Sequence, residues 1–443
     1  MASFSDLNLN KQLLNALSDL GFETPTPIQE KAFPIIMSGK DAIGIAQTGT
    51  GKTFSYLLPI LRQLNFVEQR QPRVLIVVPT RELVVQVVSE IEKLAKYMTI
   101  RVGGVYGGGN INTQKRLVHA GLDIVVATPG RLMDLYLTRI LQFNLIQKFV
   151  IDEVDEMLNL GFRTQLVNIL DVLPKKRQNL MFSATLTEDV EKIIETHFYT
   201  PEYIEVISRG TPLAKIIQEG YNVPNFYTKV NLLESLLNRD DSMSKVLLFV
   251  KNKKIADEIQ KELEKDFGDA IGVIHSNKSQ PQRFNAIKQF DEGTHRVLIA
   301  TDVVARGIDI SDITHVVNFD ISREASSYIH RIGRTGRADK AGVAVSFVIP
   351  QELEYQKQIE ALMGKKIAML ALPDDVIVST FLTQDEKPAT RDKTIKKIKR
   401  APIPTGGFHE KSDKNKQTNS LGKRAAEGKR RIDEKRNKFK SSK

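Results

Sequence analysis

Two hydrophobic patterns alternate along most of the chain. Short runs rich in Val, Ile and Leu, such as 74–78, have the composition of strands that are buried on both faces. Between these runs lie stretches with apolar residues three or four positions apart, such as 81–97, and this is the spacing of an amphipathic helix. Strands that alternate with helices predict an α/β fold, in which helices cover parallel sheets.

The alternation runs through the chain twice, with a break between the two series. The first series predicts strands at 41–46, 74–78, 101–106, 124–128, 149–152 and 179–183, and the second at 246–250, 270–274, 296–300, 315–318 and 343–349. Helices are predicted at 81–97, 253–265, 280–290, 324–331 and 350–363. A segment with Gly and Pro, 208–214, interrupts the pattern and is interpreted as a linker. We therefore expect one α/β domain over 1–207 and a second over 215–372.

The pattern decays after Pro373, and residues 373–443 are expected to form a disordered tail because they become polar and rich in lysine. The net charge of +11 is concentrated there: residues 387–443 hold 20 Lys and Arg against 6 Asp and Glu, a net of +14 that leaves residues 1–386 at −3. A flexible basic segment typically binds a polyanion. An inert, solubilising tail is the alternative.

Composition also excludes several classes of protein. The 443 residues include no cysteine, which excludes disulfide frameworks, zinc fingers, thiolate catalysis and iron–sulfur clusters. No apolar run approaches the ~18 residues that a membrane-spanning helix needs. The N-terminus shows no basic region followed by an apolar one, as a secretory signal would. We therefore expect a soluble, cytoplasmic protein without a membrane partner.

A glycine-rich loop between a predicted strand and a helix has the pattern of a P-loop, Ala-Gln-Thr-Gly-Thr-Gly-Lys-Thr. Its glycines let backbone N–H groups point at phosphate oxygens, and the helix N-terminus adds partial positive charge. Lys52 is expected to reach the β- and γ-phosphates of ATP, and the Thr53 hydroxyl to bind Mg²⁺. The predicted nucleotide-binding residues of the loop are Ala46, Gln47, Thr48, Gly49, Thr50, Gly51, Lys52 and Thr53.

A second acidic element follows the predicted strand at 149–152. Asp152 and Glu153 are adjacent carboxylates at the carboxyl end of this strand, where ligands bind in open α/β sheets. Asp152 is expected to hold Mg²⁺, and Glu153 to polarise the water that attacks the γ-phosphate. Together with the P-loop, this predicts an ATPase.

These elements, with further motifs in order over about residues 1–365, resemble the DEAD-box family of ATP-dependent RNA helicases, in a bacterial type with a basic C-terminal tail. The resemblance implies two tandem RecA-like domains and an ATP-driven enzyme that acts on RNA. Gly21–Gln29, Gly-Phe-Glu-Thr-Pro-Thr-Pro-Ile-Gln, resembles the family's adenine-reading segment, with Gln29 at the edge of the base. Either Phe22 or Phe4 would stack on the adenine ring.

The resemblance also implies roles for residues outside the P-loop and the acidic element. The implied RNA-backbone contacts are Thr80, Arg81, Gly107, Gly108, Thr128, Arg131, Gln280, Arg283 and Thr301. The implied coupling residues are Asp155, Ser183, Thr185 and His330. Asp309 would face the ribose, and Arg334 and Arg337 would act as arginine fingers that stabilise charge on the γ-phosphate.

The sequence departs from the family pattern at two places. The signature tetrapeptide has Val154 where the family has Ala, and His275-Ser-Asn replaces the more usual His-Gly-Asp. Because both carboxylates of the tetrapeptide's first half remain, we expect Val154 to affect the coupling between ATP and RNA rather than hydrolysis itself.

The expected mechanism is closure of the two domains on ATP and one RNA strand. Contacts to phosphates and 2′-hydroxyls position a strand without reading its bases, so recognition should be largely independent of sequence. Closure would bend the strand and separate its partner locally, and hydrolysis would reopen the domains. Two alternatives remain: a DNA-directed helicase of the same superfamily, and a non-catalytic ATP-dependent RNA clamp.

Overall fold

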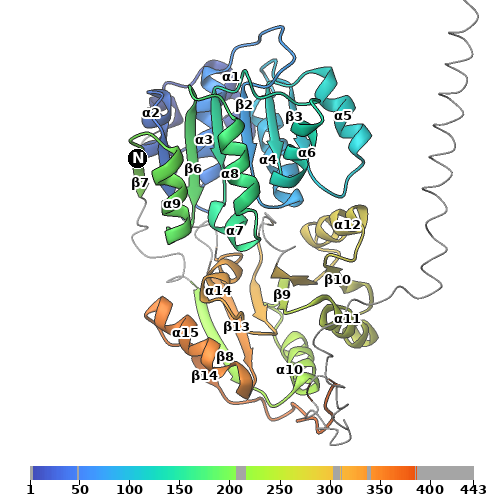
Figure 1. Ribbon diagram of the computed structural model, residues 1–443. Helices are drawn as coiled ribbons and strands as arrows, with labels where there is room; N and C mark the ends of the chain where they lie inside the picture. The colour runs from blue at the N-terminus through green and yellow to red at the C-terminus, as the bar shows by residue number, and fades with distance from the viewer. Residues whose placement is uncertain are drawn as a thin grey trace, which may run out of the picture. The chain divides into compact units, whose positions relative to one another are not determined.

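The two series of predicted strands form two separate seven-stranded sheets (Figure 1). The first has the order β3-β4-β2-β5-β6-β1-β7 and the second the order β10-β11-β9-β12-β13-β8-β14. Every strand pair recorded in the described residues is parallel. The predicted α/β class with parallel sheets is therefore confirmed.

The computed structural model describes residues 3–46, 49–205, 216–302, 310, 312–336, 341–384 and 386. The predicted linker at 208–214 and the basic residues 387–443 lie outside this part of the chain. So do four predicted site residues: Gln47, Thr48, Asp309 and Arg337.

We call residues 3–205 the first lobe. Its strands are β1 (Ala42–Ile45), β2 (Val74–Val77), β3 (Val102–Val105), β4 (Ile124–Ala127), β5 (Lys148–Ile151), β6 (Gln178–Ser183) and β7 (Glu202–Glu205). Its helices are α1 (Lys11–Asp19), α2 (Pro27–Met37), α3 (Lys52–Gln63), α4 (Arg81–Leu94), α5 (Ile111–Ala120), α6 (Pro129–Leu137), α7 (Val154–Asn159), α8 (Arg163–Val172) and α9 (Glu188–His197), with a 3-10 turn η1 (Phe4–Leu7).

The second lobe comprises the described residues from 216 to 386. Its strands are β8 (Ile216–Asn222), β9 (Val246–Val250), β10 (Ile271–Ile274), β11 (Val297–Thr301), β12 (His315–Asn318), β13 (Gly342–Val348) and β14 (Ala368–Leu370). Its helices are α10 (Phe226–Arg239), α11 (Lys253–Phe267), α12 (Gln280–Asp291), α14 (Ala325–Ile332) and α15 (Leu353–Met363), with 3-10 turns η3 (Gly268–Ala270) and η4 (Pro350–Glu352).

Strand β2 shows why these apolar runs form central strands. Val74 and Ile76 pack in one hydrophobic cluster, whereas Leu75 and Val77 pack in another on the opposite face of the sheet. Side chains of a strand alternate between its two faces, so a run without polar residues requires helices on both sides. Helices flank each sheet accordingly (Figure 1).

Three strands were not predicted from the sequence: β7, β8 and β14. Strand β7 and strand β14 are edge strands, and β8 lies next to an edge. Exposed residues interrupt all three, since β7 buries only Ile204 and β14 is exposed throughout. Their pairing partners rather than their own apolar content define them as strands.

Part of the predicted tail packs on α10. Val376 belongs to the hydrophobic core around this helix, and Asn231 Nδ2 donates to the carbonyl of Ile377 at 2.7 Å. At the start of α10, the Glu386 carboxylate accepts the backbone N–H of Phe226 at 2.6 Å. The described residues between 373 and 386 are therefore structured, although the sequence pattern placed them in the disordered tail.

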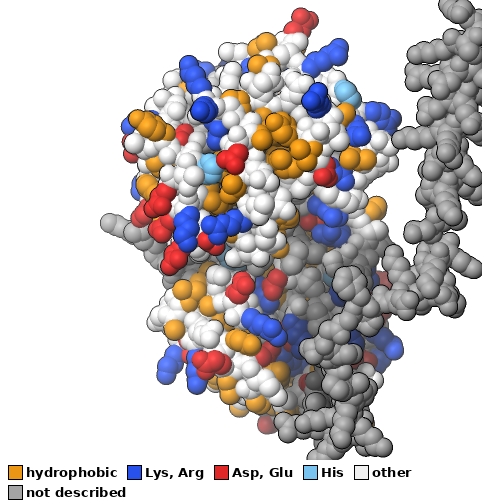
Figure 2. All heavy atoms as spheres, viewed as in Figure 1, with side chains coloured by type: hydrophobic (Ala, Val, Ile, Leu, Met, Phe, Trp, Pro, Cys, Tyr) orange, Lys and Arg blue, Asp and Glu red, His pale blue; other side chains and the backbone are white. Residues whose placement is uncertain are grey.

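The surface of the two lobes is mixed in charge, as the net charge of −3 over residues 1–386 predicts. On the face shown in Figure 2, Lys and Arg side chains are interspersed with Asp and Glu side chains. Among the described helices, none is both long enough and apolar enough to cross a membrane.

Candidate functional site

The P-loop joins β1 to α3, and its glycines have the backbone angles that this connection requires. Gly49 and Gly51 have φ angles of 81° and 87°, in the left-handed region that favours glycine. A side chain at Gly51 would also lie 2.5 Å from Nε2 of Gln29. Glycine therefore allows the loop to approach α2 closely.

Gln29 connects the adenine-reading segment to the P-loop. Its Nε2 donates to the carbonyl of Gly51 at 3.2 Å, and its Oε1 accepts the N–H of Thr26 at 2.9 Å, as part of the N-terminal cap of α2. A glutamine amide can form about four hydrogen bonds, so capacity remains for a ligand. The arrangement holds the predicted adenine site next to the phosphate loop.

The two candidate aromatic residues differ in exposure. Phe22 is 47% exposed and packs edge-on against Phe54, with ring centroids 5.2 Å apart. Phe4 is only 4% exposed and belongs to the hydrophobic core of the first lobe. Of these two rings, only Phe22 can therefore contact a bound base without a rearrangement of the core.

Two charged groups at the P-loop are buried without a hydrogen-bond partner. Neither Lys52 Nζ nor Glu153 Oε2 has one among the described residues, and both side chains are less than a tenth exposed. A buried charged group without a hydrogen bond is unfavourable, so such groups usually meet a ligand. An ammonium at the start of α3 fits the phosphates of ATP.

The Asp152 carboxylate after β5 is held in a fixed orientation. Asp152 Oδ1 accepts the N–H of Glu153 at 2.9 Å, and Asp152 Oδ2 accepts the hydroxyl of Tyr56 at 2.9 Å. Glu153 itself has a φ of 52°, a left-handed conformation that is uncommon for a residue with a side chain. Such strained backbone is found preferentially at functional sites.

Burial and neighbouring charges act in opposite directions on these carboxylates. Burial raises the pKa of Glu153, while the charges of Arg334 and Lys52 lower it. Burial likewise raises the pKa of Asp152, and Lys52 lowers it. A buried glutamate whose pKa is raised suits a group that accepts a proton from water.

The acidic segment also contacts the Ser-Ala-Thr motif and the second lobe. Asp155 Oδ2 accepts both the N–H of Thr185, at 3.0 Å, and its hydroxyl, at 2.9 Å. His330 Nε2 lies 3.4 Å from Glu156 Oε1 and 4.0 Å from Asp155 Oδ2. The Ser183 hydroxyl instead donates to the carbonyl of Thr185. One acidic segment thus meets residues that belong to both lobes.

A second contact between the lobes joins α4 to α12. Arg283 Nη2 pairs with Glu82 Oε1, and both side chains are almost fully buried. Gln280 Nε2 donates to the same Glu82 oxygen at 3.4 Å, and Arg81 Nη1 donates to Gln280 Oε1 at 3.4 Å. Gln280 and Arg283, which the sequence predicts as RNA contacts, therefore contact protein in this structure.

The other predicted RNA contacts of the first lobe lie at the carboxyl ends of neighbouring strands in its sheet. Thr80, Gly107–Gly108 and Thr128 follow the ends of β2, β3 and β4, which are neighbours in the sheet. Gly108 approaches Arg81 so closely that a side chain there would lie 2.1 Å from the guanidinium. Arg131 donates to Gln114 Oε1 at 2.8 Å. Thr301, in the second lobe, is the last residue of β11.

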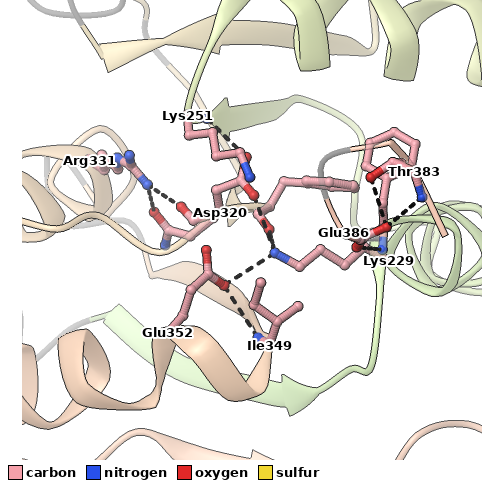
Figure 3. Close-up of polar contacts among 11 residues, drawn as sticks. Lys229, Lys251, Asp320, Arg331, Ile349, Glu352, Thr383 and Glu386 are labelled. Carbon is pink, nitrogen blue, oxygen red and sulfur yellow. Dashed lines mark hydrogen bonds and ion pairs between the residues drawn. The ribbon is translucent and has the colours of Figure 1, made fainter. Parts of the chain in front are cut away.

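A buried network holds the helix that precedes Arg334 (Figure 3). Arg331, on α14, donates to the carbonyl of Asp320 at 2.7 Å and to Asp302 Oδ2 at 2.7 Å. From the other side, Lys229 on α10 donates to Asp320 Oδ1 and to Glu352 Oε2, each at 3.3 Å. The loop after β12 is therefore fixed between two buried cations.

The two departures from the family pattern are accommodated locally. Val154 is fully buried in the apolar cluster on one face of the first sheet, where neighbouring side chains surround its methyl groups. His275 Nε2 lies 2.9 Å from Asp257 Oδ1, and the backbone N–H of Asn277 donates to His275 Nδ1 at 3.3 Å.

No motif in the sequence indicates a role for Tyr56, Glu82 or Glu156. Glu82 and Glu156 lie inside or beside recognised motifs, but their partners are in the other lobe. Tyr56 had a weak signal, since it lies one helical turn beyond Lys52 and Thr53 on α3.

Comparison with known proteins agrees with this geometry. Residues 26–193 match the DEAD/DEAH box helicase family, and residues 228–339 match the helicase conserved C-terminal domain. The chain is 39% identical over 389 residues to the ATP-dependent RNA helicase CshA of Listeria monocytogenes, covering 87% of this chain and 74% of that protein. It is 38% identical over 371 residues to the DEAD-box ATP-dependent RNA helicase CshA of Bacillus subtilis, covering 84% and 74%.

Solved structures of similar fold include RNA complexes. S. cerevisiae Dbp5 bound to RNA and ADP BeF3 matches with a TM-score of 0.77 and 29% identity, over 84% of this chain and 97% of that one. The DEAD-box helicase Mss116 bound to ssRNA and UDP-BeF matches with a TM-score of 0.75 and 27% identity, over 84% and 81%. The expected tandem RecA-like domains, ATP-hydrolysing activity and RNA partner are thereby confirmed. The chain belongs to the DEAD-box family of ATP-dependent RNA helicases.

Proposed function

We propose that this chain works in the cytoplasm by closing its two lobes on ATP and one RNA strand. It holds the strand by its sugar–phosphate backbone, and ATP hydrolysis releases it, so that short duplexes separate or RNA–protein complexes are remodelled. The observation that best supports this is the acidic segment, where Asp155 contacts Thr185 of its own lobe and Glu156 lies 3.4 Å from His330 of the other. A change in the nucleotide at Asp152 and Glu153 can therefore reach both lobes.

In the proposed ATP site, Gln29 and Phe22 bind adenine, while Lys52 and the P-loop backbone bind the phosphates. The buried Nζ of Lys52 has no hydrogen-bond partner in the part of the chain that the structure describes, and this supports the assignment, because phosphate oxygens could accept its hydrogen bonds. Glu153 orients the attacking water and accepts its proton. ATP, when bound, supplies the phosphoanhydride bond whose cleavage drives reopening.

Thr53 and Asp152 are the proposed ligands of Mg²⁺. One hydroxyl and one carboxylate suit Mg²⁺, which typically binds one or two protein oxygens together with substrate phosphates and water. Bound Mg²⁺ would neutralise charge on the β- and γ-phosphates.

Residues of the second lobe are also proposed to contact ATP. Arg334 is proposed to stabilise charge on the γ-phosphate, and its effect on the pKa of Glu153 supports this position. Arg337 is proposed as a second arginine finger and Asp309 as a ribose contact, although both lie outside the described residues.

The proposed RNA surface lies at the carboxyl ends of strands in the first sheet. It comprises Thr80, Arg81, Gly107–Gly108, Thr128 and Arg131, with Thr301 in the second lobe. These groups offer hydroxyls, guanidinium groups and backbone N–H groups, which bind phosphates and sugars without reading bases. Gln280 and Arg283 are proposed to support closure by binding Glu82.

ATP hydrolysis by the wild type and by Glu153→Gln tests this function. Wild-type turnover should rise when single-stranded RNA is added and much less with DNA of the same sequence. In Glu153→Gln, the RNA-stimulated turnover should fall by about 100-fold, the scale of lost general-base catalysis, while ATP still binds. Glu188→Gln, at a side chain that is 91% exposed, is the matched control and should behave as wild type.

Each alternative function predicts a different result. Equal stimulation by DNA and RNA would favour a DNA-directed helicase. ATP-dependent RNA binding without wild-type turnover would favour a non-catalytic clamp. Full turnover in Glu153→Gln would contradict the role of Glu153.

We also propose that the basic residues 387–443 tether the enzyme to RNA, on the basis of their charge of +14. Deleting them should weaken RNA binding and flatten its salt dependence, because each phosphate neutralised on single strands contributes about 0.7 to the logarithmic salt slope. ATP turnover at saturating RNA should change little. An unchanged salt slope would favour an inert, solubilising tail.

A further inference from the structure

The hydroxyl of Tyr56 contacts Asp152, one of the two proposed Mg²⁺ ligands. Tyr56 is fully buried on α3, and its hydroxyl donates to Asp152 Oδ2 at 2.9 Å. This hydrogen bond connects the P-loop helix to the acidic end of β5.

The chemistry of the two groups sets the direction of this bond. An ionised carboxylate only accepts, so the single proton of Tyr56 goes to Asp152. Asp152 Oδ1 accepts the N–H of Glu153, so both oxygens of the carboxylate are held by protein.

The fold explains how a side chain of the P-loop helix reaches Asp152. Tyr56 lies three residues beyond Thr53 in the first turns of α3, so the two residues share a face of the helix. Strand β6 lies between β1, which leads into α3, and β5, which leads to Asp152. The Tyr56 ring packs on Phe182 of β6, with centroids 5.1 Å apart, and its hydroxyl thereby reaches the end of β5.

We infer that Tyr56 is a positioning residue that holds the Asp152 carboxylate in the orientation required for Mg²⁺. This inference rests on the magnesium site proposed above. Tyr56→Phe would keep the contact with Phe182 but remove the hydrogen bond to Asp152. Asp152 would then be held at one oxygen only. Its carboxylate would have to become ordered when the metal binds, and this lowers the affinity for Mg²⁺.

The test is binding of a fluorescent ATP analogue to the full chain over a range of Mg²⁺ concentrations, and in the presence of EDTA. In Tyr56→Phe, the Mg²⁺ concentration at the midpoint should rise by about tenfold, the usual scale for loss of a group that orients a metal ligand. Affinity in EDTA should match that of the wild type, because the adenine and phosphate contacts are untouched. Turnover should recover at high Mg²⁺.

Two further variants separate the possible outcomes. Tyr97→Phe removes another tyrosine hydroxyl that donates to an aspartate, Asp19 at 2.7 Å, and should titrate as wild type. Asp152→Asn should lose most of the Mg²⁺ effect; if it does not, the proposed magnesium site itself is wrong. If Asp152→Asn loses the effect but Tyr56→Phe titrates like the wild type, Tyr56 only fills the core and the inference is overturned. Equal weakening by Tyr56→Phe with and without Mg²⁺ would overturn it too.

Discussion

Replacing Arg334 by alanine is expected to lower the RNA-stimulated turnover of ATP by about a thousandfold, the scale reported for loss of an arginine finger. Arg334 is buried, and its charge opposes the effect of burial on the pKa of Glu153. The proposed role of its guanidinium is to stabilise negative charge as the γ-phosphate departs. Because this charge develops in the transition state, kcat should fall while ATP affinity changes little. Single-turnover hydrolysis at saturating RNA measures the rate of the chemical step. Binding of a fluorescent ATP analogue measures the affinity for ATP.

The pH profile gives a second readout of the same variant. Since the charge of Arg334 lowers the pKa of Glu153, its removal should raise that pKa, and the acid limb of kcat should move to higher pH. Arg239→Ala is the control, because Arg239 pairs with Asp375 at the surface of the same lobe. A variant of Arg334 that raised the KM for ATP at unchanged kcat would instead assign this arginine to ground-state binding.

Reversing the charge of Glu82 should weaken ATP-dependent RNA binding by about 10²- to 10³-fold. In Glu82→Arg the buried pair with Arg283 is replaced by two like charges, and breaking a buried ion pair typically costs about 3–5 kcal/mol. Loss of the pair destabilises the closed arrangement of the lobes, because the two residues belong to different lobes. Fluorescence anisotropy of labelled single-stranded RNA, with a non-hydrolysable ATP analogue, measures the effect.

The double variant Glu82→Arg with Arg283→Glu tests whether the pair itself is responsible. It restores opposite charges and should recover part of the lost affinity. Glu92→Arg makes the same charge change at an exposed position of α4 and should bind RNA almost as the wild type does. If Glu82→Arg binds as tightly as Glu92→Arg, closure does not depend on this pair. A double variant as weak as Glu82→Arg alone would place the effect elsewhere.

Central strands were predictable because their apolar runs carry the signal. Strands β9 and β12 match the predicted ranges at both ends, and β2 differs by one residue. Strands β7 and β14 were missed because edge strands are partly exposed and are defined by the neighbour with which they pair. Such pairing depends on the folded sheet, not on the local pattern.

The residues of the candidate site also divide into those that the sequence predicted and those that it did not. The P-loop and the acidic element could be recognised because each is a contiguous segment at the end of a strand. Tyr56 and Glu82 were missed because their partners, Asp152 and Arg283, lie 96 and 201 residues away in the sequence. No local pattern reports a contact over that separation.

The sequence by itself determined the α/β class, the ATP-binding chemistry and the basic charge beyond residue 386, since periodicity, motifs and composition are local properties. Only the tertiary structure decided that Phe22 rather than Phe4 is exposed, and that Arg283 pairs with Glu82. It alone brought the Tyr56 hydroxyl to Asp152. The physical reason is that burial and pairing depend on which distant segments pack together, and packing is a property of the whole fold.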